Sequence, residues 1–213
     1  MKNKIILLSG GMDSTTLLYQ YKDKIKLAVS FDYGSKHNKM ELKYAKLNCD
    51  KLKIKHTIIK LGFVNKLFKS SLLKSGGEIP EGHYESKSMK STVVPFRNGI
   101  MLSIVGGLAE SENCDSILIA NHFGDHAIYP DCRKSFIRYM SQAIQAGTYN
   151  KILITAPYTK LSKKNIAAIG LTLRIDYTKT YSCYKGKKIH CGKCGTCVER
   201  KEALHGFDKT KYK

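Results

Sequence analysis

KIILLSGGMDSTTLLYQ, residues 4–20, is the stretch that decides the fold. The apolar run from Ile5 to Leu8 predicts a buried strand, and the pattern from Ser14 to Tyr21 predicts a helix directly after it. Short apolar runs and helical patterns alternate along the rest of the chain in the same way. Continuous apolar strands between helices indicate a parallel sheet that is covered by helices on both faces. The expected fold class is therefore α/β.

The remaining elements are expected at intervals that suit this architecture. Strands are predicted at 27–31, 56–61, 116–120 and 152–156, and helices at 38–52, 100–110, 136–146, 163–171 and 198–204. The segment Lys74–Thr92 is polar, contains glycines and has no clear period. It is expected to form a loop or a lid.

The turn after the first strand, SGGMDS at residues 9–14, has the properties of a phosphate site. Two glycines let backbone N–H groups approach a phosphate closely, and the N-terminus of the following helix adds a positive partial charge. The hydroxyls of Ser9 and Ser14 are further donors, and Asp13 is a candidate magnesium ligand or helix cap. A turn without a ligand is the alternative, but open parallel sheets bind ligands at this place.

Composition narrows the class of protein. The 213 residues carry a net charge of +20, but lysine is spread along the chain rather than gathered in one run. We interpret the charge as a general lysine bias rather than as a nucleic-acid footprint. No apolar run reaches the roughly 18 residues of a membrane span, and the N-terminus lacks the features of a signal peptide. A cytoplasmic protein with no membrane partner and no stable nucleic-acid partner is expected.

Four of the seven cysteines lie close together near the C-terminus, namely Cys183, Cys191, Cys194 and Cys197. Their spacing suits a tetrahedral zinc ion with every position filled by a thiolate, which is a structural site. An iron–sulfur cluster and a catalytic cysteine pair are the alternatives. Because metal would hold a segment with little apolar content, we expect a catalytic domain at 1–177 and a small zinc-binding segment at 178–213.

The SGGMDS loop resembles the motif of the PP-loop ATP-pyrophosphatases, and the Walker spacing is missing. The resemblance implies a Rossmann-like adenine-nucleotide α-hydrolase fold with ATP and Mg²⁺ as cofactors. Members adenylate an oxygen so that a nitrogen or sulfur nucleophile can displace AMP. On this resemblance the ATP-binding residues would be Leu8, Ser9, Gly10, Gly11, Met12, Asp13, Ser14 and Phe31. Of these, Ser9, Asp13 and Ser14 would be the catalytic residues.

A narrower resemblance covers nearly the whole chain. Besides the loop it rests on FDYG at 31–34, His37 with Glu41-Leu42, VPFRN at 94–98, YPDCRKSF at 129–136, SCY at 182–184 and CGKCGTC at 191–197. This set resembles the 7-cyano-7-deazaguanine synthase (QueC) family. The resemblance implies a carbon–nitrogen ligase that acts on 7-carboxy-7-deazaguanine and ammonia, with structural zinc and often as a homodimer.

An anionic, purine-like substrate needs a cation and hydrogen-bonding or flat partners. Arg97 and Arg133 are candidate clamps for carboxylate or phosphate, since guanidinium binds such groups bidentately. Asp125 and Asp131 are candidate acceptors for the guanine-like N–H edge, and Tyr129 is a candidate stacking partner. The expected substrate-binding residues are Arg97, Asn98, Asp125, Tyr129, Asp131 and Arg133.

Simpler roles stay open for several of these residues. Arg97 is alternatively an ion-pairing residue at a helix start, and Asp131 a cap for the helix after Pro130. Cys132 is expected to be a packed residue rather than a nucleophile. His37 and His122 are expected to be structural or close to adenine.

Phe96 departs from the family pattern, which usually has glycine between Pro95 and Arg97. A bulky ring there is expected to narrow the pocket or to shift the loop. An enzyme that stops at the 7-amido compound is therefore one alternative. A PP-loop enzyme that acts directly on tRNA is another.

Overall fold

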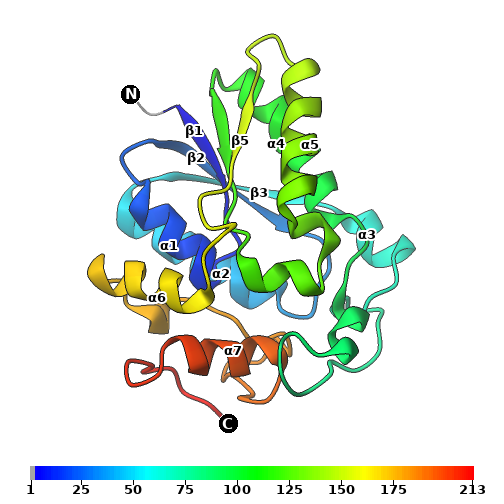
Figure 1. Cartoon of the computed structure of the whole chain (residues 1–213), viewed down its shortest axis with the longest axis vertical. Coiled ribbons are helices and arrows are strands. Elements are labelled where there is room, and N and C mark those ends of the chain that lie inside the picture. Colours follow the sequence, from blue (N-terminus) through cyan, green and yellow to red (C-terminus); the bar gives the residue numbers. More distant parts are fainter. Residues whose placement is uncertain (1–2) are drawn as a thin grey trace.

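The computed structural model describes residues 3–213 and contains one parallel sheet in the order β3-β2-β1-β4-β5 (Figure 1). The strands are β1 (Lys4–Leu7), β2 (Ile25–Asp32), β3 (Lys55–Lys60), β4 (Ser116–Leu118) and β5 (Leu153–Thr155). The helices are α1 (Met12–Gln20), α2 (Asn38–Leu52), α3 (Gly62–Leu67), α4 (Arg97–Ser111), α5 (Lys134–Ala146), α6 (Lys163–Thr172) and α7 (Gly195–Ala203). Short 3-10 turns are η1 (Lys87–Thr92), η2 (Phe123–Ala127), η3 (Pro130–Cys132) and η4 (Tyr177–Lys179).

The expected α/β architecture is confirmed, and every predicted strand and helix is present. The sequence patterns do not predict α3 or the 3-10 turns, because these segments are too short to show a period. Within residues 3–213, every helix falls short of the length or the apolarity that a bilayer crossing requires.

The two faces of the sheet are buried against different helices. Successive residues of a strand point to opposite faces, so Ile5 joins the core under α4 and α5, whereas Ile6 joins the core under α1, α2 and α6. Both isoleucines are fully buried. Figure 1 shows α4 and α5 on one side of the sheet and α1, α2 and α6 on the other. This double covering explains why β1 is a continuous apolar run.

The strand order creates a crevice at the carboxyl end of β1. The chain passes from β1 to β2 on one side and later returns to β4 on the other side of β1. Ligands bind at such a reversal of strand order in open α/β sheets. The SGGMDS loop lies at this place.

The C-terminal segment from 178 onward packs against the same core as the sheet. Tyr181 and Cys183 belong to the largest apolar cluster, and Leu204 packs beside Met12. Arg200 of α7 is fully buried and donates hydrogen bonds to the hydroxyls of Thr180 and Thr210. The boundary at 177/178 stays a prediction, but the segment shares its core with the sheet.

The polar segment Lys74–Thr92 is a loop that ends in η1, as expected. It lies against the cysteine segment, because Gly82 N donates to Lys193 O at 3.0 Å and Glu81 forms a β-bridge with Cys194. Met89, within η1, is fully buried. The part of the prediction that concerns a lid stays a prediction.

Candidate active site

A cavity of about 230 Å³ opens at the carboxyl ends of β1, β2 and β4. Its wall contains most of the predicted site residues, namely Leu8, Ser9, Gly11, Met12, Asp13, Ser14, Phe31, Arg97, Asn98, Asp125 and Tyr129. Three predicted residues, Gly10, Asp131 and Arg133, do not line it. Residues that are far apart in the chain thus form a single site.

The phosphate loop is held in shape by its own serines. The two hydroxyl oxygens of Ser9 and Ser14 lie 2.9 Å apart, and the backbone N–H of Gly11 donates to Ser9 Oγ at 3.1 Å. Gly11 is the N-cap residue of α1. Because glycine has no side chain, no side-chain hydrogen bond caps this helix. The N-terminus of α1 therefore faces the cavity and suits an anion.

Gly10 has a structural task beneath the loop. Its φ is +86°, and a Cβ there would lie 2.2 Å from the backbone oxygen of Glu41 in α2. Its carbonyl accepts a hydrogen bond from Tyr181 N at 2.9 Å. Met12, which contributes to the wall, has its side chain buried beside Leu204. Both residues shape the loop from below.

A buried group of charges surrounds Asp13. Lys163 Nζ lies 3.1 Å from Asp13 Oδ2 and 2.7 Å from Glu199 Oε2. Burial alone would lower the pKa of Lys163, but Asp13, Glu199 and Asp125 outweigh it and raise the pKa. Asp13 Oδ1 is buried without a hydrogen-bond partner among the described residues. The sequence analysis missed Lys163 and Glu199, which have no motif around them.

Asp125 and His122 extend this group across the cavity. Asp125 Oδ1 accepts from Tyr84 Oη at 2.9 Å, and its Oδ2 accepts from His122 N at 3.0 Å. His122 Nδ1 accepts from Gly124 N at 3.1 Å, and its Nε2 faces Asp125 Oδ1 at 3.3 Å. Burial raises the pKa of Asp125, but His122 and Lys163 outweigh it and lower the pKa. Asp125 is therefore an ionised and well-bonded carboxylate.

The opposite end of the cavity contains Arg97 among tyrosines. Arg97 Nη1 donates to Tyr33 Oη at 3.2 Å, and the guanidinium carbon lies 5.6 Å from the centre of the Tyr33 ring. Tyr129 Oη lies 2.8 Å from Thr92 Oγ1 and 3.0 Å from Tyr184 Oη. A cation and fixed aromatic rings therefore share this end, as a flat anionic substrate requires.

Asp131 and Arg133 lie elsewhere. Asp131 Oδ2 accepts from the backbone N–H of Asn98 at 2.8 Å, so it stabilises the N-terminus of α4 rather than that of the helix after Pro130. Arg133 is exposed, and its Nε donates to the His126 carbonyl at 3.1 Å. The structure does not bring either side chain into the cavity.

Phe96 and Cys132 flank the start of α4. Phe96 is 57 % exposed and meets the Phe136 ring edge-on with centroids 5.6 Å apart. The expectation that its ring narrows the pocket is wrong, because Phe96 is not in the cavity wall. Cys132 does line the cavity, but burial raises the pKa of its thiol and Asn98 Nδ2 donates to its sulfur at 3.2 Å. This favours a packed residue over a nucleophile.

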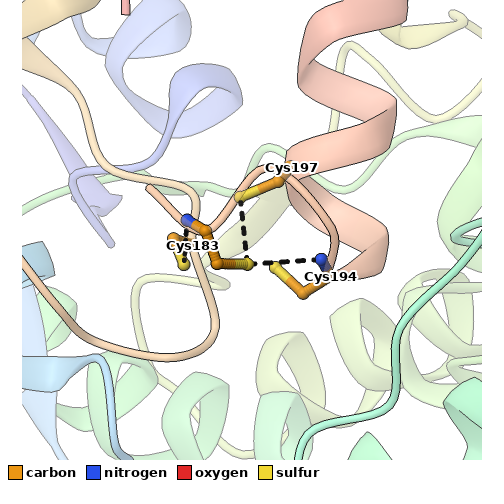
Figure 2. A group of neighbouring side chains, drawn as sticks. Cys183, Cys194 and Cys197 are labelled. Carbon is orange, nitrogen blue, oxygen red and sulfur yellow. Dashed lines mark hydrogen bonds between the residues drawn. The ribbon is translucent and has the colours of Figure 1, made fainter. Parts of the chain in front are cut away.

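The four C-terminal cysteines converge, as Figure 2 shows for Cys183, Cys194 and Cys197. All four sulfurs lie within 4.8 Å of one another, and those of Cys191 and Cys197 are 3.9 Å apart. Zinc–sulfur bonds of about 2.3 Å place tetrahedral ligands about 3.8 Å apart, so the set fits a single zinc ion. An iron–sulfur cluster is larger than one ion and would hold the sulfurs farther apart.

The chemistry of the thiols also suits a metal. Hydrogen bonds from Cys183 and Cys197 lower the pKa of Cys194. The backbone N–H of Cys194 points at Cys191 Sγ at 3.3 Å, which stabilises a thiolate there. Tyr184 and Thr196, which neighbour these ligands in the chain, line the cavity. The cysteine-containing segment thus forms one wall of the site.

Comparisons with known proteins agree over nearly the whole chain. The family model described as "Queuosine biosynthesis protein QueC" matches residues 3–208. A 7-cyano-7-deazaguanine synthase of Porphyromonas gingivalis strain ATCC 33277 is 60 % identical over 99 % of this chain and 97 % of its own length. One from Desulfotalea psychrophila is 52 % identical over 100 % of this chain and 99 % of its own length.

A solved structure shows a related fold. The NMN synthetase from Francisella tularensis aligns with a TM-score of 0.50 at 12 % identity, over 89 % of this chain and 69 % of that chain. At this identity the likeness concerns the fold alone.

Proposed function

Because this chain belongs to the QueC family of queuosine biosynthesis proteins, we propose that it forms 7-cyano-7-deazaguanine from 7-carboxy-7-deazaguanine, ammonia and ATP. Relatives with the name 7-cyano-7-deazaguanine synthase align with it from end to end. The reaction is that of a carbon–nitrogen ligase. The closeness of these relatives supports the nitrile as end product.

One observation carries this function. A single cavity joins the N-terminus of α1 and the SGGMDS loop to an arginine that lies among tyrosines. The loop end suits the phosphates of ATP, and the Arg97 end suits a flat, oxygen-rich heterocycle. The two substrates of an adenylation would thus meet inside one site.

The chemistry consists of two activations. A carboxylate oxygen attacks the α-phosphorus of ATP and pyrophosphate leaves, and ammonia then displaces AMP from the acyl carbon to give an amide. The amide oxygen attacks a second ATP, pyrophosphate leaves again, and loss of AMP with two protons leaves the nitrile. Ser9, Ser14 and the backbone N–H groups of the loop would hold the phosphates, while Lys163 would offset developing negative charge.

Two metals accompany this proposal. Mg²⁺ would neutralise phosphate charge, and the unpartnered Asp13 Oδ1 suits it as an oxygen ligand. Zinc would be held by Cys183, Cys191, Cys194 and Cys197 as a structural ion. A homodimer stays a prediction from the family resemblance.

The deciding experiment is mass spectrometry of the products from purified protein with 7-carboxy-7-deazaguanine, ammonium and Mg-ATP. We expect nitrile, with two AMP per nitrile formed. Accumulated amide with one AMP each would replace the proposal by an enzyme that stops one step early. No turnover by the folded, zinc-loaded protein, together with salt-resistant retention of tRNA, would replace it by a tRNA-modifying enzyme.

A further inference from the structure

Glu41 is a carboxylate of the cavity wall that the roles above leave unused. It belongs to the first turn of α2, and its side chain is 17 % exposed, toward the cavity. Residues 3–213 donate no hydrogen bond to its oxygens, and His37 Nε2 lies 3.5 Å from Oε2. That distance is too long for a strong hydrogen bond. Glu41 therefore has free acceptor capacity inside the site.

The other two carboxylates in the wall are already engaged. Asp13 pairs with Lys163 beside the phosphate loop. Both oxygens of Asp125 accept hydrogen bonds, from Tyr84 and from the His122 backbone. Asp131, a sequence-based candidate for the purine edge, caps α4 outside the cavity. Asp13 keeps one free oxygen, Oδ1, beside the phosphate loop. Among the described residues, Glu41 is thus the cavity carboxylate with both oxygens free of hydrogen bonds.

The surroundings of Glu41 favour a neutral donor rather than a second cation. Burial raises the pKa of Glu41 to about 8, and Arg97 acts against that rise. Arg97 shares the cavity wall with Glu41 and donates to Tyr33 Oη there at 3.2 Å, so a cation already lies in its surroundings. His37 is buried, and burial together with Arg97 lowers its pKa to about 3, which keeps it neutral. Two N–H donors of a ligand favour the ionised form of Glu41 and so lower its pKa on binding. The resulting carboxylate, with a guanidinium in the same wall, presents an acceptor next to a donor.

A deazaguanine carries the complementary pattern on its pyrimidine edge. Its O6 is an acceptor, and the adjacent N1–H and 2-amino group are donors. We propose that Glu41 is the residue that selects the deazaguanine, accepting from N1–H and the 2-amino group while Arg97 donates to O6. This inference rests on the proposed function, and it deepens it by assigning the specificity of the site. Tyr184, whose ring lies near His37, would cover one face of the heterocycle.

The test compares two substrates that differ only at this edge. AMP release is measured with 7-carboxy-7-deazaguanine and with 7-carboxy-7-deazahypoxanthine, which lacks the 2-amino group, for the wild type and for Glu41→Gln. We expect the wild type to prefer the deazaguanine, and Glu41→Gln to lower its kcat/KM by roughly 10- to 100-fold. The same variant should affect the deazahypoxanthine much less, so the preference collapses. The KM values for ATP and ammonia should stay unchanged.

Two controls separate recognition from folding. Asp50→Asn removes an exposed carboxylate from the same helix, where it pairs with Lys46, and should leave both substrates unaffected. Calorimetry with 7-cyano-7-deazaguanine in the absence of ATP measures binding of the heterocycle alone, because no adenylation occurs. It therefore reports on recognition of the pyrimidine edge. Glu41→Gln should weaken this binding, whereas Glu41→Asp, which keeps the charge, should weaken it less.

Specific outcomes would overturn the inference. An unchanged preference for the deazaguanine in Glu41→Gln would remove Glu41 from its recognition. A raised KM for ATP alone would assign Glu41 to adenine, and a raised KM for ammonia alone would assign it to the amine. If the wild type turned over neither compound, the proposed function itself would fail, which is a result distinct from these.

Discussion

Phe96 is the residue at which this chain departs from its family pattern, and its backbone explains the usual glycine. Its φ is 52°, in the left-handed region that residues with a Cβ rarely occupy. The strain is offset by contacts of the ring, which lies over Gly99 and against Phe136. The departure thus concerns the local stability of the start of α4 and not the shape of the pocket.

Phe96→Gly and Phe96→Ala should separate these two effects. Glycine relieves the left-handed strain but loses the ring, so its stability should stay within about 1 kcal/mol of the wild type. Alanine loses the ring and keeps the strain, so it should be less stable than glycine by about 1 kcal/mol. Urea unfolding measures both, and the product should remain the nitrile in each. A change of product in Phe96→Gly would return this residue to the pocket.

Glu41 should give the protein a recognisable pH dependence. Burial raises its pKa from 4.5 to about 8 in the folded state. Below pH 4.5 both folded and unfolded states hold the proton, and between pH 4.5 and 8 only the folded state does. The free energy of unfolding should therefore fall across this window in the wild type relative to Glu41→Gln. Denaturant unfolding at several pH values checks it, and a constant difference between the two proteins would contradict it.

At the scale of elements, the phosphate loop depends on its contact with α2. Gly10→Ala combines a positive φ with a clash against the Glu41 backbone, neither of which can be relieved by a side-chain movement. We expect a loss of about 2–4 kcal/mol in stability and strongly weakened ATP binding. Gly77→Ala is the matched control, since open space surrounds it, and it should change stability by less than about 0.5 kcal/mol. Near-normal ATP binding by Gly10→Ala would show that the loop tolerates a shift of α2.

Helix α7 links the four-cysteine cluster to the SGGMDS-loop end of the site. Cys194 and Cys197 lie at its start, and Glu199, one half-turn further, holds Lys163 at 2.7 Å. Cys194→Ser should therefore lower the zinc content, the thermal stability and the rate of pyrophosphate release together. Cys114→Ser removes a thiol that lies outside the cluster and should keep its zinc. Full zinc content and activity in Cys194→Ser would refute the structural role of the metal.

At the scale of the whole molecule, the chain has one continuous core. The segment after 177 contributes Tyr181, Cys183 and Leu204 to clusters that the sheet and α1 also build. Its buried Arg200 ties η4 to the C-terminal residues through Thr180 and Thr210. The predicted catalytic domain and zinc-binding segment therefore share one core, and the division between them describes their different residues rather than two separate folding units.

A protein that ends at residue 177 should consequently fail to fold by itself. Truncation exposes the apolar surface around Met12 and Tyr44 that the segment covers, and it leaves the phosphate loop without its contact to Tyr181. Circular dichroism melting should show no cooperative transition above about 30 °C. A soluble, cooperatively unfolding fragment would establish 1–177 as an independent domain.

The sequence alone was sufficient for those features that depend on neighbours in the chain. Apolar periodicity predicted the strands and helices, as for α2, whose bounds agree with the prediction. The SGGMDS loop and the four cysteines are local motifs, so their residue types and spacing were enough to predict a phosphate site and a zinc site. The alternation of strands and helices predicted a parallel sheet. It therefore also predicted a ligand site at the carboxyl end of β1, because open parallel sheets bind ligands at the carboxyl ends of their strands.

Only the tertiary structure decided which side chains face the cavity. Lys163 lines the cavity and holds Glu199 of another helix, and no spacing in the sequence predicts this pair. Glu41 belongs to a recognised motif, but only packing shows that its side chain reaches the cavity. Asp131 and Arg133 belong to a specific motif, yet a turn at η3 directs one to α4 and the other to the surface. Local sequence determines elements and motifs because their forces act over a few residues, whereas side-chain direction at a site depends on contacts between residues far apart in the chain.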